Sequence, residues 1–255
     1  MQESSWPTNC PETLYDICLD YCALNLDRVL CNKSADGQLI LKSEIYLPPY
    51  VCDALITHLH PIGRRHLPLL ANPGAVNFRQ INLKSVTDLS DAELKHLLAH
   101  HPKDLRLSSE QLSEQSLCLI SSGSHNLQTL QLVKCDNVFS QRSPRKKHPW
   151  KKKCCKDPSK RIGLFHCPKV RYVAFRGIQF SAGEMLSYLL SNLTLITRLD
   201  LSDTDINEQH LRAALSELKK LQILSLHSVT LKPNLRDYFE AVAQVKSLRS
   251  LLQIL

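Results

Sequence analysis

The sequence predicts an α/β fold, namely a leucine-rich-repeat solenoid (horseshoe) preceded by a small α-helical N-terminal domain. Leucine supplies 46 of the 255 residues, and a short apolar pattern returns at nearly constant intervals along most of the chain. Before residue 76 this pattern is absent, and apolar residues recur every three or four positions instead, as they do on an amphipathic helix. We therefore divide the chain into a helical region, 1–76, and a repeat region, 77–255.

The repeat places apolar residues at positions i, i+3, i+5 and i+8. Counted at the second of these positions, its copies fall at Ile81, Leu105, Leu130, Val173, Leu199 and Leu224. The steps between them are 24, 25, 43, 26 and 25 residues. All but one step lie within the period of roughly 20–29 residues that is typical of leucine-rich repeats. Another strand-like pattern begins near the C-terminus with Leu248 and Leu251.

Each copy is expected to form a short strand followed by a helical return. The i+3 and i+5 residues share one face of the strand and point into the core. Asp91–His100 and Glu208–Leu218 are two of the predicted helices. No repeat can bury its apolar side alone, so stacked neighbours must supply the core, and the result is a binding scaffold. The intervening strand positions are expected to be exposed and do not indicate a ligand: Asn82, Arg106, Gln131, Ala174, Asp200 and Ser225.

The formal charge of +8 comes from one segment of the chain. Residues 140–161 hold ten of the 32 basic side chains and one of the 24 acidic ones, so the remainder is close to neutral. The segment coincides with the one long step, which predicts a basic, disordered insertion at about 140–162 between two repeats. Its main cations are Arg145, Lys146, Lys147, Lys151, Lys152 and Lys153.

Three interpretations of this basic loop remain open. It resembles a nuclear-localisation signal, it offers Trp150 for stacking on a nucleic-acid base, or it is only a solvated loop. Nucleic-acid binding is not favoured, because the charge does not extend over the rest of the chain.

Several other classes of protein are disfavoured. No stretch approaches the roughly 18 consecutive apolar residues that span a bilayer. The first residues lack the basic and apolar regions of a secretory signal, which favours the cytoplasm or the nucleus and reduced thiols for the ten cysteines. Nothing singles out a catalytic residue, so the chain is not expected to be an enzyme. No cofactor or metal site is predicted, because no Cys-x-x-Cys occurs among the nearby donors Cys135, His148, Cys154, Cys155, His166 and Cys167.

The region before the repeats contains two predicted helices. The first runs from Thr13 to Leu30, with Thr13 and Asp16 as a capping box. The second runs from Pro49 to about His60. On periodicity alone, these helices would pack on the first repeat as an N-terminal cap.

The first helix carries a more specific spacing. Thr13-Leu14-x-x-x-Cys18-x-x-x-Cys22 resembles the elongin-binding box of von Hippel–Lindau-type ubiquitin-ligase receptors, in which a small residue and a leucine are followed by a cysteine and an aliphatic residue. Here Cys22 replaces the aliphatic residue, and a buried thiol behaves as a small hydrophobe.

The second helix resembles the box that accompanies it. Leu47-Pro48-x-x-Val51-x-x-x-Leu55 is similar to a cullin box, with an apolar residue and a proline followed by two spaced apolar residues. Both boxes in this order, followed by leucine-rich repeats, resemble the zyg-eleven and zer family of substrate receptors for cullin-two RING ubiquitin ligases. The likeness to the zer branch rests on the segments 14–27, 47–53 and 130–139.

This resemblance implies a non-catalytic receptor that recruits a protein substrate. The first box would enter an apolar groove on elongin C, which carries elongin B, and the second would contact cullin-two. The substrate would then lie close to a ubiquitin-charged enzyme. In the family an armadillo-like domain after the repeats holds the pocket for N-terminal glycine degrons. This sequence ends before any such domain, so degron recognition is not carried over. The alternative is a generic leucine-rich-repeat interaction scaffold, directed to the nucleus by its basic loop.

Overall fold

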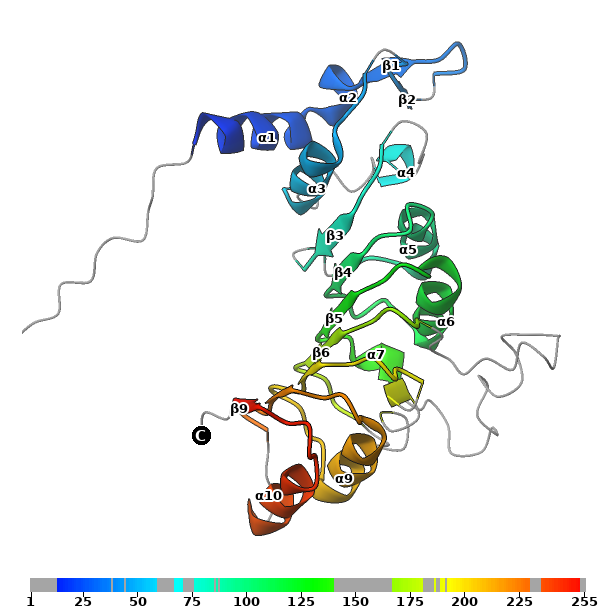
Figure 1. The fold of residues 1–255 in the computed structure, drawn as a ribbon. Helices are drawn as coiled ribbons and strands as arrows, with labels where there is room; N and C mark the ends of the chain where they lie inside the picture. The colour runs from blue at the N-terminus through cyan, green and yellow to red at the C-terminus, as the bar shows by residue number, and fades with distance from the viewer. Residues whose placement is uncertain are drawn as a thin grey trace, which may run out of the picture.

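The computed structural model describes residues 13–37, 39–43, 45–58, 67–70, 76–84, 86, 88–139, 167–180, 186, 189–190, 192–229 and 235–252. The basic insertion expected at 140–162 lies outside these residues, together with its six main cations. The described chain forms a curved array of strands and helices with a helical segment at its N-terminal end (Figure 1).

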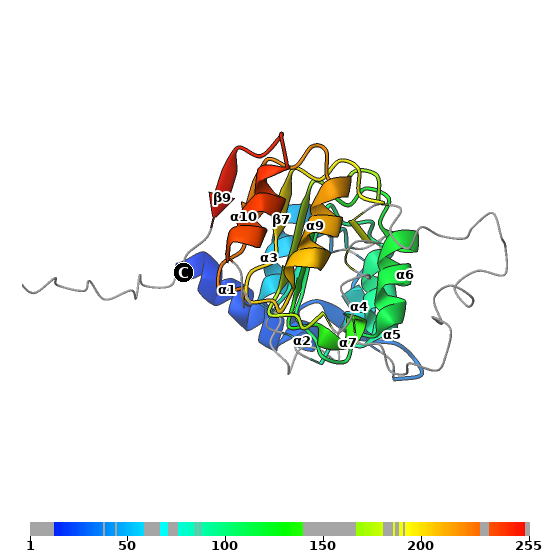
Figure 2. The same ribbon diagram turned by 90° about the horizontal axis from the view of Figure 1, so that it is seen from below.

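The array is one parallel sheet of seven strands, which follow one another in chain order. Its strands are β3 (Gln80–Leu83), β4 (Asp104–Leu107), β5 (Thr129–Val133), β6 (Tyr172–Arg176), β7 (Arg198–Asp200), β8 (Ile223–Ser225) and β9 (Ser250–Leu252). The helices between them are α5 (Asp91–Leu98), α6 (Glu114–Gly123), α7 (Asp136–Phe139), α9 (Glu208–Glu217) and α10 (Leu235–Ala243). Both views show α5 and α6 on one side of the strands, which form the concave side of a solenoid (Figures 1 and 2).

The register of the sheet follows the repeat found in the sequence. Ile81 pairs with Leu105, and the same row continues through Leu130, Val173, Leu199 and Leu224 to Leu251. Apart from the partly buried last residue, the whole row lies in the core. The predicted leucine-rich-repeat solenoid is therefore confirmed, and the C-terminal pattern does form a further strand.

The long step of 43 residues adds no strand to the described sheet. β5 and β6 pair directly and in parallel over five residues each, from Thr129 opposite Tyr172 to Val133 opposite Arg176. The surplus residues therefore do not change which strands are neighbours.

The strand positions between the core residues are less exposed than expected. Asn82 and Arg106 are half-buried. The other four positions are buried, which corrects the expectation for Gln131, Ala174, Asp200 and Ser225. Neighbouring strands of a sheet are only about 4.8 Å apart, so larger side chains on adjacent strands cover small and medium ones. The guanidinium of Arg176 lies against Asp200 in this way, with its Nε 2.8 Å from Oδ2.

Four residues that follow the strands share a left-handed backbone conformation. Lys134, Gly177, Asp203 and Ser228 have φ angles of 53°, 60°, 59° and 52°. By the register of the strands, all four occupy the same place in their repeats. The N–H of the first three donates to a carbonyl of the next repeat, namely Lys134 to Arg176 at 2.8 Å, Gly177 to Ser202 at 3.1 Å and Asp203 to His227 at 2.8 Å. The chain therefore bends in the same way after each of these strands. The hydrogen bonds between neighbouring repeats continue past the ends of the strands.

The N-terminal segment contains more elements than the sequence predicted. They are α1 (Leu14–Leu24), α2 (Leu26–Val29), the antiparallel strands β1 (Cys31–Lys33) and β2 (Leu39–Leu41), α3 (Pro49–Thr57) and α4 (Leu67–Leu70). The hairpin of β1 and β2 was not predicted. The expected single helix from Thr13 to Leu30 breaks at Asn25, whose side-chain Nδ2 donates to the carbonyl of Tyr21 at 2.9 Å. Asparagine ends helices because its amide competes for backbone groups in this way.

Candidate functional site: the outer surfaces of α1 and α3

Helix α1 is apolar on two opposite faces. Its inner face buries Leu19 and Ala23, and the helix packs against α3. Its other face is exposed to solvent, although it consists of apolar or weakly polar side chains. We call this surface the α1 outer face; it consists of Leu14, Ile17, Cys18, Tyr21 and Leu24.

The α1 outer face has the spacing of a helix that docks in a groove. Its members follow one another at steps of three, one, three and three residues, so they form a single stripe along the helix. Leu14, at its N-terminal end, is 76% exposed. A contiguous apolar surface of this kind on a soluble protein marks an interaction site more often than an isolated exposed leucine does.

The residues of the elongin-like box are only partly at the centre of this stripe. Leu14 and Cys18 lie on it and are exposed, whereas Cys22 is half-buried at its edge. Burial raises the pKa of the Cys22 thiol, so this side chain is protonated and acts as a small hydrophobe. The sequence analysis did not name Ile17 and Tyr21 as site residues, although the steps of three residues from Leu14 to Ile17 and of four from Ile17 to Tyr21 were the signal that could have found them.

The start of α1 is fixed by the predicted capping box. The N–H of Asp16 donates to Oγ1 of Thr13 at 3.2 Å, and the N–H of Thr13 donates to Oδ2 of Asp16 at 3.2 Å. The hydrogen bonds from Thr13 also hold the pKa of the Asp16 carboxyl below its usual value. Thr13 therefore acts by ordering the first turn of the helix, directly before the exposed Leu14.

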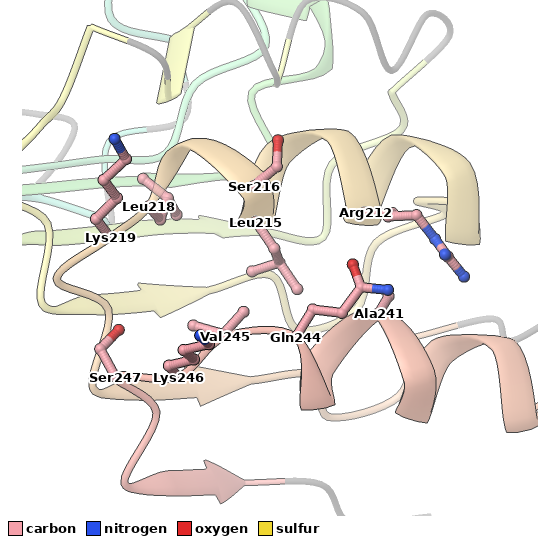
Figure 3. A pocket seen from close by; sticks show the side chains of 10 residues that line it. All are labelled: Arg212, Leu215, Ser216, Leu218, Lys219, Ala241, Gln244, Val245, Lys246 and Ser247. Atoms are coloured by element: carbon pink, nitrogen blue, oxygen red, sulfur yellow. The ribbon is translucent and has the colours of Figure 1, made fainter.

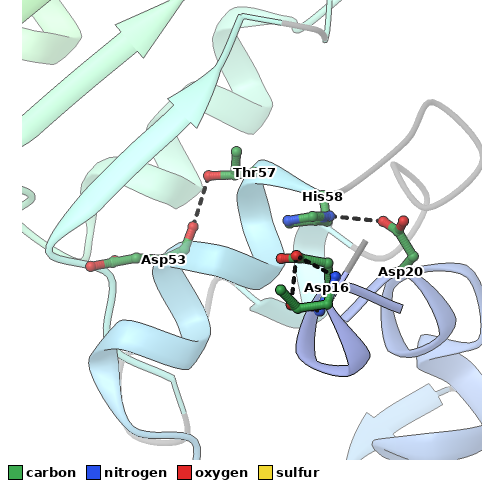
Figure 4. A network of polar contacts seen from close by, with 6 residues as sticks. Asp16, Asp20, Asp53, Thr57 and His58 are labelled. Carbon is green, nitrogen blue, oxygen red and sulfur yellow. Dashed lines mark hydrogen bonds and ion pairs between the residues drawn. The ribbon is translucent and has the colours of Figure 1, made fainter. Parts of the chain in front are cut away.

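A polar contact joins α1 to α3. Nδ1 of His58, at the end of α3, lies 2.8 Å from Oδ1 of Asp20 in the middle of α1 (Figure 4). This bond and the burial of Leu19 and Ala23 fix the direction in which the α1 outer face points.

The cullin-like box divides between the surface and the core. Leu47, Pro48 and Val51 are half-buried at the N-terminal end of α3. Leu55 is 2% exposed and packs inward, so it holds α3 in place and does not face a partner; this corrects its expected role in contacting a cullin. The same end of α3 presents two aromatic side chains that were not predicted, Tyr46 and Tyr50, and both are strongly exposed.

Helix α3 is in turn attached to the first strand of the array. Oδ1 of Asp53 accepts hydrogen bonds from the N–H groups of Arg79 and Gln80, each at 2.9 Å. Burial raises the pKa of this carboxyl, while the two N–H groups act in the opposite direction. Oγ1 of Thr57 donates to the carbonyl of Asp53 at 2.9 Å, one turn further along (Figure 4). α1, α3 and β3 are therefore linked in series by side-chain hydrogen bonds.

A pocket of about 300 Å³ lies between α9 and α10 (Figure 3). Arg212, Lys219 and Lys246 are among the residues that line it, and Arg212 already donates to Oε1 of Glu208 at 2.9 Å. The side chains that line it show no nucleophile placed against a base. It therefore gives no support to a catalytic role.

The described cysteines of the repeat region have a structural role. The buried Sγ of Cys135 accepts from the N–H of Ser109 at 3.4 Å and donates to the carbonyl of Val133 at 3.3 Å. Burial raises the pKa of Cys135, and it raises the pKa of Cys167 to about 12, so both thiols stay protonated. Among the residues that the structure describes, no group of three His, Cys, Asp or Glu side chains is arranged to hold a metal ion. Nor is any helix of that part of the chain long and apolar enough to cross a membrane.

Comparison with known proteins identifies relatives for part of the chain. No family model matches the sequence. The zer-1 homologs of Homo sapiens and Mus musculus are each 29% identical to it in an alignment of 143 residues that covers 52% of this chain but only 18% of theirs. Among solved structures, the leucine-rich repeat-containing protein LegL7 from Legionella pneumophila is 13% identical, with a TM-score of 0.45 over 81% of this chain and 70% of that one. The chain is thus a partial relative of the zer-1 homologs, as the resemblance of its sequence to the zer branch predicted.

Proposed function

We propose that this chain is a non-catalytic substrate-receptor subunit of a cullin-two–elongin B/C RING ubiquitin ligase. The observation that carries the proposal is the α1 outer face, an exposed apolar stripe on a helix whose opposite side is already packed. The relationship to the zer-1 homologs supports it, although the matched stretch is 18% of their length.

Elongin C is the proposed partner of α1. An amphipathic helix binds in an apolar groove through side chains spaced by three and four residues. Leu14 and Cys18 supply two such anchors, and Ile17 and Tyr21 extend the contact along the same face. Burying these side chains removes apolar area from water, and a fully buried leucine contributes about 2 kcal/mol.

Cullin-two is the proposed partner of the N-terminal end of α3. Tyr46 and Tyr50 are exposed beside Pro48 and Val51, and tyrosine is enriched among the residues that dominate binding energy at interfaces. The bond between His58 and Asp20 holds the two helices together, so that elongin C and cullin-two would meet one preformed surface.

The repeats then supply the surface that holds the protein substrate. The receptor itself performs no chemistry; it raises the concentration of its substrate near the ubiquitin-charged enzyme. Its location would be the cytoplasm, the nucleus or both, wherever these partners occur.

Co-purification with elongin B and elongin C tests the assignment of α1. The variant Leu14→Ser/Cys18→Ser should lose the association, because it removes two anchors of the stripe. A matched control is Ile40→Ser/Phe239→Ser, which removes two exposed apolar side chains outside the stripe. The control should bind as the unaltered chain does. Full retention of elongin by the first variant would overturn the proposal.

The generic scaffold is separated from the receptor by the same variants. If α1 served only as a cap, loss of Leu14 would be expected to damage folding. Since Leu14 is exposed, we expect the Leu14→Ser/Cys18→Ser variant to unfold at an unchanged urea midpoint. Tyr46→Ala/Tyr50→Ala should weaken cullin-two binding and leave the elongin complex intact.

A further inference from the structure

The concave side of the first four strands gathers positive charge. Side chains alternate between the two faces of a strand, so Lys84 follows Asn82 on this side, and Arg176 follows Ala174. Arg106 lies opposite Asn82 on the neighbouring strand β4. Three cationic side chains, from β3, β4 and β6 or the residues just after them, therefore project from one surface; we call Lys84, Arg106 and Arg176 the concave cation cluster.

Asp200, an acidic residue close to this cluster, already has hydrogen-bond partners. Asp200 accepts hydrogen bonds from Nε and a terminal nitrogen of Arg176, and its other oxygen accepts from Ser202. Lys84 and Arg106 have no hydrogen bond or ion pair to any residue within the described ranges. The cluster thus keeps two cations that form no direct ion pair with a carboxylate of the described chain.

The surroundings of Lys84 show that these charges act on one another. Partial burial and the repulsion of Arg106 and Arg176 lower the pKa of the Lys84 ammonium, and the attraction of Asp200 only partly opposes them. A ligand that brings a carboxylate to this place would relieve the repulsion between the cations.

A second observation points to a polypeptide ligand. Oδ1 of Asn82 is buried and has no hydrogen-bond donor in the part of the chain that the structure describes. When the Asn82 side chain turns outward on binding, this oxygen can accept an N–H, which a peptide backbone supplies and a phosphate does not. Asp104 also lies on the concave side, two register positions before Arg106, and places one negative charge beside the cluster that repels any anionic ligand close to it.

We propose that the concave face of β3 to β6 binds an extended acidic peptide segment of a partner protein. A carboxylate of the peptide lies between Lys84 and Arg106, with Arg176 beside them, and a backbone N–H donates to Oδ1 of Asn82 once that side chain has turned outward. This surface is distinct from the α1 outer face, and the proposal does not depend on binding to elongin or cullin.

Fluorescence anisotropy with the full chain and labelled peptides tests the proposal. The probes are Glu-Gly-Glu-Ser-Glu-Gly-Glu-Ser and its counterpart with glutamine in place of glutamate. We expect the acidic peptide to bind at least about tenfold more tightly than the neutral one, with an affinity that falls as salt is added. Equal binding of the two peptides, or no binding of either, would overturn the proposal.

Variants decide whether the concave cation cluster is the site. Lys84→Gln/Arg106→Gln should weaken binding of the acidic peptide by about tenfold or more. Neither side chain has a partner to lose in the described chain, so the fold should persist, which circular dichroism checks. The control Lys219→Gln/Lys246→Gln makes the same change of charge at the pocket between α9 and α10 and should bind within about twofold of the unaltered chain. An equal loss of affinity in both variants would overturn the assignment of the site to the concave cation cluster.

Two alternatives are outcomes of the same measurements. Replacing the six main cations of the basic segment with glutamine should leave the affinity for the acidic peptide within about twofold, whereas loss of binding would place the site there and overturn the proposal. A single-stranded oligonucleotide of equal charge should bind more weakly than the peptide. Tighter binding of the oligonucleotide, lost in Lys84→Gln/Arg106→Gln, would assign the face to nucleic acid instead.

Discussion

The imidazole of His58 and the carboxylate of Asp20 lie 2.8 Å apart and connect the helix of the elongin-like box to the helix of the cullin-like box. About one third of each side chain is exposed, at 30% and 34%, so solvent screens their interaction. We expect a double-mutant cycle with His58→Ala and Asp20→Ala to give a coupling of about 0.5 kcal/mol in urea unfolding. A coupling of zero within error would contradict a role for this bond in joining α1 to α3.

The ion pair of Arg176 and Asp200 should matter more for stability. Asp200 is 1% exposed, and removal of its partner leaves a buried carboxylate without compensation. Because the Arg176 side chain is 41% exposed, water screens part of this loss, and we expect Arg176→Met to cost about 2 kcal/mol of unfolding free energy. Lys169→Met, which removes an exposed lysine bonded to Asn126, is a control that should cost much less.

The ion pair of Arg176 and Asp200 also predicts how the stability of the fold changes in acid. Burial alone would raise the pKa of Asp200, but hydrogen bonds from Arg176 and Ser202 outweigh it and hold the pKa below the usual 3.8. A carboxyl whose pKa is lower in the folded state stabilises the fold above its unfolded pKa, and this stabilisation disappears as pH falls below about 4. Asp200→Asn should therefore be less stable at pH 7 but lose less stability between pH 5 and pH 3. Identical acid unfolding curves would contradict this assignment.

The environment of His100 predicts that the stability of the fold depends on pH near neutrality. Its Nε2 donates to the carbonyl of Leu70 at 2.7 Å, and its ring packs edge-on against Phe78, with ring centroids 4.7 Å apart. Burial lowers its pKa below the usual 6.5. The unfolded chain therefore takes up the proton first, so the free energy of unfolding should fall as pH drops through 6.5. Thermal unfolding at pH 7.5 and pH 5.5 measures this fall, which His100→Gln should reduce; an unchanged fall would assign it to other histidines.

The residues with a left-handed backbone conformation after the strands predict opposite changes in stability for two substitutions. Gly177→Ala places a side chain at φ +60°, with its Cβ 3.2 Å from Cγ of Lys134, and should destabilise the chain by about 1 kcal/mol. Ser228→Gly removes the strain at φ 52° and should stabilise it by a few tenths of a kcal/mol to about 1 kcal/mol. Urea midpoints measure both changes. Effects of the same sign would show that backbone conformation does not limit these positions.

The sequence predicted the array well because one pattern governs it. Each repeat contributes the same row of core residues, so the pairing of Ile81 with Leu105 follows from the spacing alone. The turn at Asn25 and the hairpin of β1 and β2 were missed, since they depend on single side-chain bonds and on short segments without a period.

The candidate sites were predicted less completely than the fold. Periodicity shows which residues share a face of a helix, but it does not show which of two apolar faces is covered. For this reason the elongin-like box included Leu14 and Cys18 but not Ile17 or Tyr21. The cullin-like box included Leu55 as a contact residue, although the core covers this side chain. The concave cation cluster was missed because its members are far apart in the sequence and meet only through the register of the sheet.

The direct pairing of β5 with β6 across 43 residues separates distance along the chain from distance in space. Neighbouring strands stay about 4.8 Å apart whatever the length of the connection between them. The connection between two strands can therefore lengthen, shorten or acquire a new sequence while the strands that it joins keep their spacing and register. The length of a connection and the geometry of the sheet can in this sense change independently of each other during evolution.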